Sequence, residues 1–62
     1  MLTLNVMGDV LKIRALEADF AGRLRVTDRW KPNDINVVVD NDGDADDIID
    51  WCDDHEVEAV IV

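Results

Sequence analysis

Residues 35–62 have the sequence INVVVDNDGDADDIIDWCDDHEVEAVIV. The apolar runs at 35–40 and 57–62 each favour a buried β-strand. The segment between the two runs carries apolar residues at helical spacing, namely Ala45, Ile48, Ile49 and Cys52. An Asp-Gly-Asp break ends at Asp44, which is the predicted N-cap of a helix that extends to about His55. This part of the chain therefore predicts a strand, a helix and a second strand.

The N-terminal part predicts the same succession. Alternating apolar residues indicate a half-buried first strand: Leu2, Leu4 and Val6. Asp9 is a suitable N-cap for a helix, and Gly22 suits the left-handed position just after it. The apolar residues of this helix would be Val10, Ile13, Leu16 and Phe20. Alternatively, Gly8-Asp9 could form a two-residue hairpin turn that leads into a strand at Val10–Leu16.

After Gly22 the apolar period returns to two, which predicts another strand. Its inward-facing residues would be Leu24, Val26 and Trp30, and its outward-facing residues Arg23, Arg25, Thr27 and Arg29. Pro32 and its polar neighbours predict a turn at 31–34.

The predicted order is β-α-β-β-α-β within one domain, residues 1–62. This order is the ferredoxin-like α+β arrangement, a two-layer sandwich with both helices on one face of an antiparallel sheet. The uncovered sheet face would then carry Thr3, Asn5, Arg23, Arg25, Arg29 and Asn36. The alternative fold starts with a β-hairpin and has one or two helices.

Charge divides the chain into two unequal parts. All six basic residues precede Pro32, whereas eleven of the fifteen acidic residues follow it. The net charge of −9 therefore arises entirely in the second half. A surface of this kind attracts basic proteins and repels nucleic acid and anionic membranes. A generic acidic domain from a halophile is a further alternative, although halophilic acidity should extend over both halves.

The predicted second helix has its acidic residues on one arc, opposite the apolar residues. At about 100° per residue, this arc comprises Asp46, Asp47, Asp50, Asp53 and Asp54. Carboxylates at i,i+3 and i,i+4 disfavour a helix, and no lysine lies among them. We therefore predict a partner-binding surface on this arc. Asp42, Asp44, Glu56 and Glu58 would extend it, and Trp51 would be an apolar anchor.

Motifs for catalysis, cofactors or metals are not evident in the sequence. The chain has no Ser, Gln or Tyr, and its single Cys excludes a disulfide framework. Cys52 falls on the apolar face of its helix, as a buried thiol does. We expect a non-enzymatic, soluble, cytoplasmic protein without a cofactor, either a monomer or a small homo-oligomer.

Five segments of the chain resemble the TusA-type sulfur carriers. Val10–Leu16 is similar to the first helix of that family, and four further segments match its second half: Pro32-Asn33-Asp34, Val37–Asp40, Asp47-Ile48 and Trp51-Cys52. The family carries a persulfide on a Cys-Pro-x-Pro motif, where this chain has Val6-Met7-Gly8-Asp9. The resemblance implies a sulfur carrier or a degenerate relative of one.

Size and charge resemble a different group of proteins, the small acidic inhibitors of the anti-CRISPR and anti-restriction type that phages encode. Several of these proteins act as DNA mimics. This resemblance implies docking on a basic nucleic-acid-binding protein in the cytoplasm of a host cell, without direct contact to nucleic acid or membrane. We take this interpretation as the leading one and the sulfur carrier as the alternative.

Overall fold

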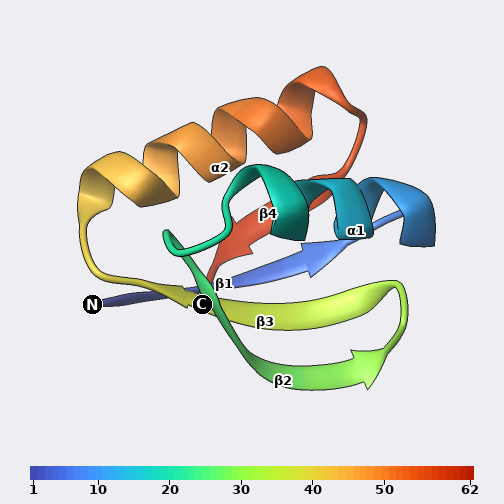
Figure 1. Ribbon diagram of the computed structural model, residues 1–62, viewed down its shortest axis with the longest axis horizontal. Helices are drawn as coiled ribbons and strands as arrows, with labels where there is room; N and C mark the ends of the chain where they lie inside the picture. The colour runs from blue at the N-terminus through green and yellow to red at the C-terminus, as the bar shows by residue number, and fades with distance from the viewer.

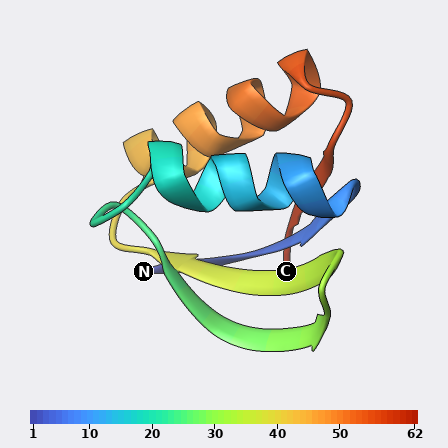
Figure 2. The same ribbon diagram turned by 45° about the vertical axis from the view of Figure 1, so that its right-hand side comes forward.

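Two helices cover one face of a four-stranded antiparallel sheet (Figures 1 and 2). The computed structural model describes all 62 residues. Its elements are β1 (Leu2–Met7), α1 (Val10–Asp19), β2 (Arg25–Lys31), β3 (Asp34–Val39), α2 (Asp42–Asp54) and β4 (Glu58–Ile61). The strand order is β2-β3-β1-β4, and every neighbouring pair is antiparallel. The ferredoxin-like prediction is therefore confirmed. Neither helix is long and apolar enough to cross a membrane.

Residues after β1 form a helix, so the alternative of a hairpin at Gly8-Asp9 is wrong. Asp9 is extended, and its side chain accepts a hydrogen bond of 2.8 Å from the backbone N–H of Leu11. This bond satisfies one of the N–H groups that a helix start leaves without an intrahelical partner. Gly22 adopts a φ of +83°, as the sequence predicted for the end of this segment.

Helix α2 begins at Asp42, and its N-cap is Asn41 rather than Asp44. The Asn41 side chain accepts a hydrogen bond of 2.8 Å from the backbone N–H of Asp44, and its amide donates to the Asp44 carboxylate at 3.3 Å. This reciprocal pair, together with two acidic residues in the first turn, offsets the helix cost of Gly43.

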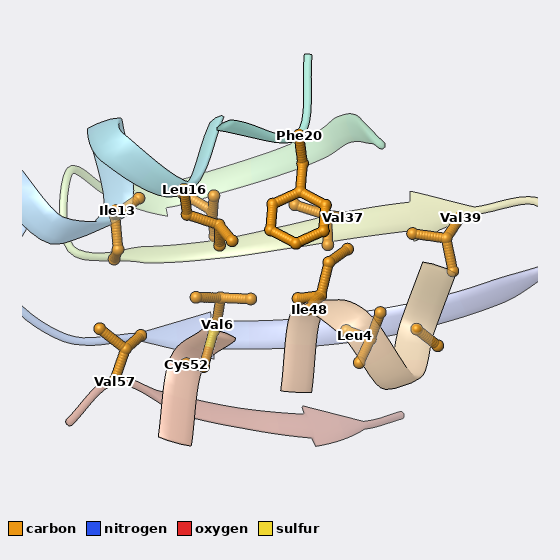
Figure 3. Close-up of a cluster of buried hydrophobic side chains, with 12 residues drawn as sticks. Leu4, Val6, Ile13, Leu16, Phe20, Val37, Val39, Ile48, Cys52 and Val57 are labelled. Atoms are coloured by element: carbon orange, nitrogen blue, oxygen red, sulfur yellow. The ribbon is translucent and has the colours of Figure 1, made fainter. Parts of the chain in front are cut away.

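The core lies between the helices and the sheet (Figure 3). Its buried residues come from both helices, the residue that caps the end of α1, β1, β3 and the segment before β4: Leu4, Val6, Ile13, Leu16, Phe20, Ile35, Val37, Val39, Ala45, Ile48, Cys52 and Val57. No polar or charged residue is buried. The two periodicities seen in the sequence thus converge on one apolar layer.

Strand β2 departs from the predicted alternation. Its register with β3 shifts twice, between Val26 and Asp28 and between Arg29 and Lys31. Because a bulge adds a residue to one strand, the residues after it change face. Arg29 therefore lies opposite buried Ile35, on the helix side of the sheet. The prediction that Arg29 faces outward and Trp30 inward is wrong.

The uncovered sheet face is consequently less basic than predicted. Arg25 pairs with Val38 on that face, but Arg23 precedes β2 and reaches α2 instead. Asn5 lies there as predicted, and its amide donates to the side chains of Asp34 and Asn36, both at 2.9 Å. The open face therefore carries the hydrogen bonds of the Asn5 amide to one carboxylate and one amide oxygen, and no row of arginines.

Candidate protein-binding surface

Four aspartates on the outer side of α2 form the most acidic exposed surface of the protein. We call this set the acidic arc: Asp46, Asp50, Asp53 and Asp54. All four are exposed, and none takes part in an ion pair. The same helix turns Ala45, Ile48 and Cys52 into the core, so the apolar stripe holds the arc toward solvent.

Asp44 and Asp47 were predicted on the same surface, but both contact Arg23. Nη2 of Arg23 lies 2.8 Å from Asp44 Oδ1 and also donates to Asp47 Oδ2. These hydrogen bonds, first to Asp44 and then to Asp47, raise the pKa of Arg23. The Arg23 guanidinium also lies over the ring of Phe20, 4.9 Å from its centroid. The charges of Asp44 and Asp47 are thus partly neutralised within the chain.

Trp51 lies in the seam between the two helices, apart from the acidic arc. Its indole N–H donates to Asp19 of α1 at 2.9 Å, and its ring stacks on His55 with 3.8 Å between centroids. The other end of this seam is closed by Lys12, whose Nζ donates to the backbone oxygen of His55 at 2.7 Å. Trp51 is half-buried and already has partners, which leaves less of it to serve as an anchor.

Three further acidic residues continue the surface beyond the arc. Asp42 is the first residue of α2, whereas Glu56 and Glu58 follow its C-terminus and lead into β4; all three are exposed. Glu56 adopts a left-handed backbone with a φ of 58°, which turns the chain back toward the sheet. The acidic surface therefore runs along the whole length of α2 and onto the edge of β4.

Cys52 is buried in the core, where burial raises the pKa of its thiol to about 11. Such a thiol is neutral near pH 7 and is a poor nucleophile. No group of three or more His, Cys, Asp or Glu side chains is arranged to hold a metal ion.

The sequence pattern correctly placed Asp46, Asp50, Asp53 and Asp54 on the exposed side of α2, but it missed the ion pair of Asp47 and the contacts between the helices. Helical spacing alone places Asp46, Asp50, Asp53 and Asp54 on one side. The bonds of Arg23 and Trp51 depend on where α1 and β2 lie in space, and no local pattern encodes that. The only signal for the Arg23 contacts in the sequence is that Arg23 lies three residues after Phe20.

No protein-family model matches the chain, and no curated protein matches it. A solved structure with a similar fold is the acyltransferase domain from module 8 of the salinomycin polyketide synthase. The two share 20% identity with a TM-score of 0.79. The match covers 98% of this chain but only 14% of the chain in that structure. At this identity the likeness concerns the fold alone.

Proposed function

We propose that this protein is a non-enzymatic binding module whose acidic arc docks on a basic, nucleic-acid-binding surface of a partner protein. The observation that carries the proposal is the set of four exposed carboxylates on one helix, none of them in an ion pair. In this role the protein would occupy the place of nucleic acid and act as an inhibitor.

The arc has an energetic cost to the isolated protein. Asp50 is a helical neighbour of Asp46, Asp53 and Asp54 at i,i+3 or i,i+4. Each such pair of like charges disfavours a helix by about 0.2–0.5 kcal/mol. Asp53 and Asp54 also lie at the C-terminal end of α2, where the helix dipole disfavours negative charge. A solvated face needs no such arrangement, whereas a surface selected to attract cationic side chains does.

The basic side chains that do reach α2 all approach from the side of α1. Arg23 contacts Asp44 and Asp47, and Lys12 contacts the backbone oxygen of His55. The outer side of α2 lies at the margin of the molecule and faces away from the sheet (Figure 1). The outer carboxylates therefore remain free to form ion pairs with lysine and arginine side chains of another protein.

The spacing of the carboxylates suits a site that normally holds phosphates. Helical neighbours at i,i+3 and i,i+4 have Cβ atoms about 5–6 Å apart, so the arc presents a regular row of anions. Such a row would release counterions from a groove lined with lysine and arginine, as a nucleic-acid backbone does. The net charge of −9 disfavours nucleic acid and anionic membranes as direct ligands. A location in the cytoplasm is part of this proposal.

Two charge-matched variants test the proposal. The first reverses two residues of the arc, Asp50→Lys and Asp54→Lys. The second reverses two exposed aspartates outside it, Asp28→Lys on β2 and Asp40→Lys after β3. Both change the net charge by the same amount, so only the position of the charge differs. Neither pair includes a residue whose side chain takes part in an ion pair.

Each protein is immobilised and used to capture binding proteins from a cell extract, and the captured protein is then challenged with duplex DNA. We expect the wild type and the Asp28/Asp40 variant to retain a partner that the Asp50/Asp54 variant loses, and DNA to displace it. Equal retention by both variants would contradict the proposal, as would a partner that binds DNA and this protein together. Thermal unfolding of the Asp50/Asp54 variant should show a fold at least as stable as the wild type, because repulsion is relieved.

The alternative role as a sulfur carrier requires an accessible thiol. The chain has one cysteine, and Cys52 is 1% exposed with a pKa of about 11. The chain therefore has no exposed thiol, and no observation favours this role over the binding module.

A further inference from the structure

A cationic groove lies on the side of the molecule where α1 passes over the end of β2. It is open to solvent, has a volume of about 450 Å³, and is lined by Arg14, Glu17, Arg29, Trp30, Lys31 and Pro32. Binding sites for small molecules in proteins have volumes of about 300–1,000 Å³. The groove is therefore large enough for a ligand of moderate size.

The charge of the groove is opposite to that of the protein. Three of its lining residues are cationic, and its single acid, Glu17, is hydrogen-bonded to Arg29 Nη2 at 2.7 Å. Arg14 and Lys31 take part in no ion pair. Two cations thus remain free within a chain whose net charge is −9. An anion that approaches this side meets a local positive field and a guanidinium of Arg29 that Glu17 already holds in position.

Trp30 gives the groove an aromatic wall. Trp30 is 63% exposed, although tryptophan is among the residues with the largest apolar surface to bury. The register shift between Arg29 and Lys31 removes Trp30 from the regular alternation of β2 and from the core layer. Bulges often redirect a side chain in this way at binding sites. An exposed indole beside three cations is suited to stack on a planar ring that carries a negative group.

We propose that this groove binds a small phosphate-bearing aromatic ligand of the nucleotide class, with the ring on Trp30 and the phosphate between Arg14 and Lys31. The site is separate from the acidic arc on α2, so the proposal does not depend on the function proposed above. The ligand is a free small molecule, because a longer strand would bring many phosphates close to a strongly acidic protein.

The two tryptophans make a direct test possible. Trp30 lines the groove, whereas the indole N–H of Trp51 is bonded to Asp19 in the helix seam. In ¹H–¹⁵N spectra of the whole protein, titration with adenosine monophosphate should shift the Trp30 indole signal in a saturable manner and leave the Trp51 signal in place. A Trp30→Phe variant identifies which signal is which. An unmoved Trp30 signal at millimolar nucleotide would overturn the proposal.

Two arginine variants separate a site from general attraction to positive charge. Arg14 lies in the groove and Arg25 on the uncovered sheet face, and both are exposed and outside any ion pair. Loss of one charge-assisted hydrogen bond corresponds to about a tenfold weaker affinity. We therefore expect Arg14→Gln to weaken binding about tenfold and Arg25→Gln to change it less than about twofold. An equal effect of both variants would contradict a defined site.

Three further probes test the class of ligand. Adenosine lacks the phosphate and inorganic phosphate lacks the ring, so each should bind more weakly than adenosine monophosphate. Phosphate that binds as tightly as the nucleotide would overturn the role of Trp30. A short single-stranded oligonucleotide that binds more tightly than the mononucleotide would overturn the assignment to a free small molecule.

Discussion

Arg23 Nη2 lies 2.8 Å from Asp44 Oδ1, and this ion pair ties the segment before β2 to the first turn of α2. The same guanidinium also reaches Asp47 one turn later and lies over Phe20. One cation thus joins two aspartates of the acidic helix to the C-terminal end of α1. The interaction reduces the repulsion between Asp44 and Asp47. It leaves the four aspartates of the acidic arc without an ion pair.

Replacement of Arg23 by Gln should lower the urea midpoint of unfolding slightly, because Asp44 and Asp47 lose their counter-charge. The contribution of such an exposed pair is modest and is screened by salt. The difference between wild type and variant should therefore shrink as sodium chloride is added. Arg25→Gln, which removes the same charge without an ion pair, is the control. A loss that is equal in both variants would contradict the proposed role of Arg23.

Replacement of Glu56 by Gly should stabilise the protein. Glu56 has a φ of 58°, and its N–H donates to the backbone oxygen of Asp53 while that of Val57 donates to Cys52. These bonds form a Schellman motif, in which glycine is the preferred residue at the left-handed position. We expect a gain of about 0.5–1 kcal/mol, or several degrees in Tm for a chain of this size.

Glu56→Gln is the matched control for this prediction. It removes the same negative charge from the C-terminal end of α2 but keeps a side chain in the left-handed conformation. Thermal unfolding followed by circular dichroism should place the Gly variant above the Gln variant. If the two unfold at the same temperature, the effect is due to charge rather than to backbone strain.

Cys52 should make stability depend on pH in the alkaline range. Burial raises its pKa from 9.0 to about 11, so the unfolded chain loses this proton at a lower pH than the folded protein. The stabilising contribution is complete below pH 9 and is lost as the pH rises toward 11. The free energy of unfolding of the wild type should therefore fall through this window.

A Cys52→Ala variant isolates the contribution of this thiol. It should be less stable than the wild type at pH 7 because it leaves a cavity in the core. The difference in unfolding free energy between the two proteins should narrow as the pH rises from 9 toward 11. A difference that stays constant would show that the thiol is accessible and unperturbed.

Association through the acidic arc should depend steeply on salt. The Debye length falls from about 30 Å at 0.01 M to about 10 Å at 0.1 M salt, which removes long-range attraction between the arc and a basic partner. With the captured partner, surface plasmon resonance should show an association rate that falls with salt more than the dissociation rate rises. The Asp28/Asp40 variant should keep this dependence, whereas the Asp50/Asp54 variant should show no measurable association. An association rate that does not change with salt concentration would contradict electrostatic docking.

Local patterns in the sequence were sufficient for the elements and for the side of α2 that faces solvent. The alternation of Leu2, Leu4 and Val6 and the cap at Asp9 act over a few residues, so their consequences can be derived without knowledge of the rest of the fold. The apolar stripe of α2 orients the helix in the same way. For this reason the ferredoxin-like order and the exposure of the acidic arc to solvent were both predicted correctly.

Contacts between distant segments were decided only by the tertiary structure. The hydrogen bonds of β2 with β3 place the bulges that move Arg29 and Trp30 out of strict alternation, and thereby create the cationic groove. The packing of α1 against α2 brings Asp19 to Trp51, 32 residues away in sequence. Spacing along the chain determines which face of an element a residue occupies. Which side chain lies opposite that face is set by the pairing and packing of elements that are remote in sequence.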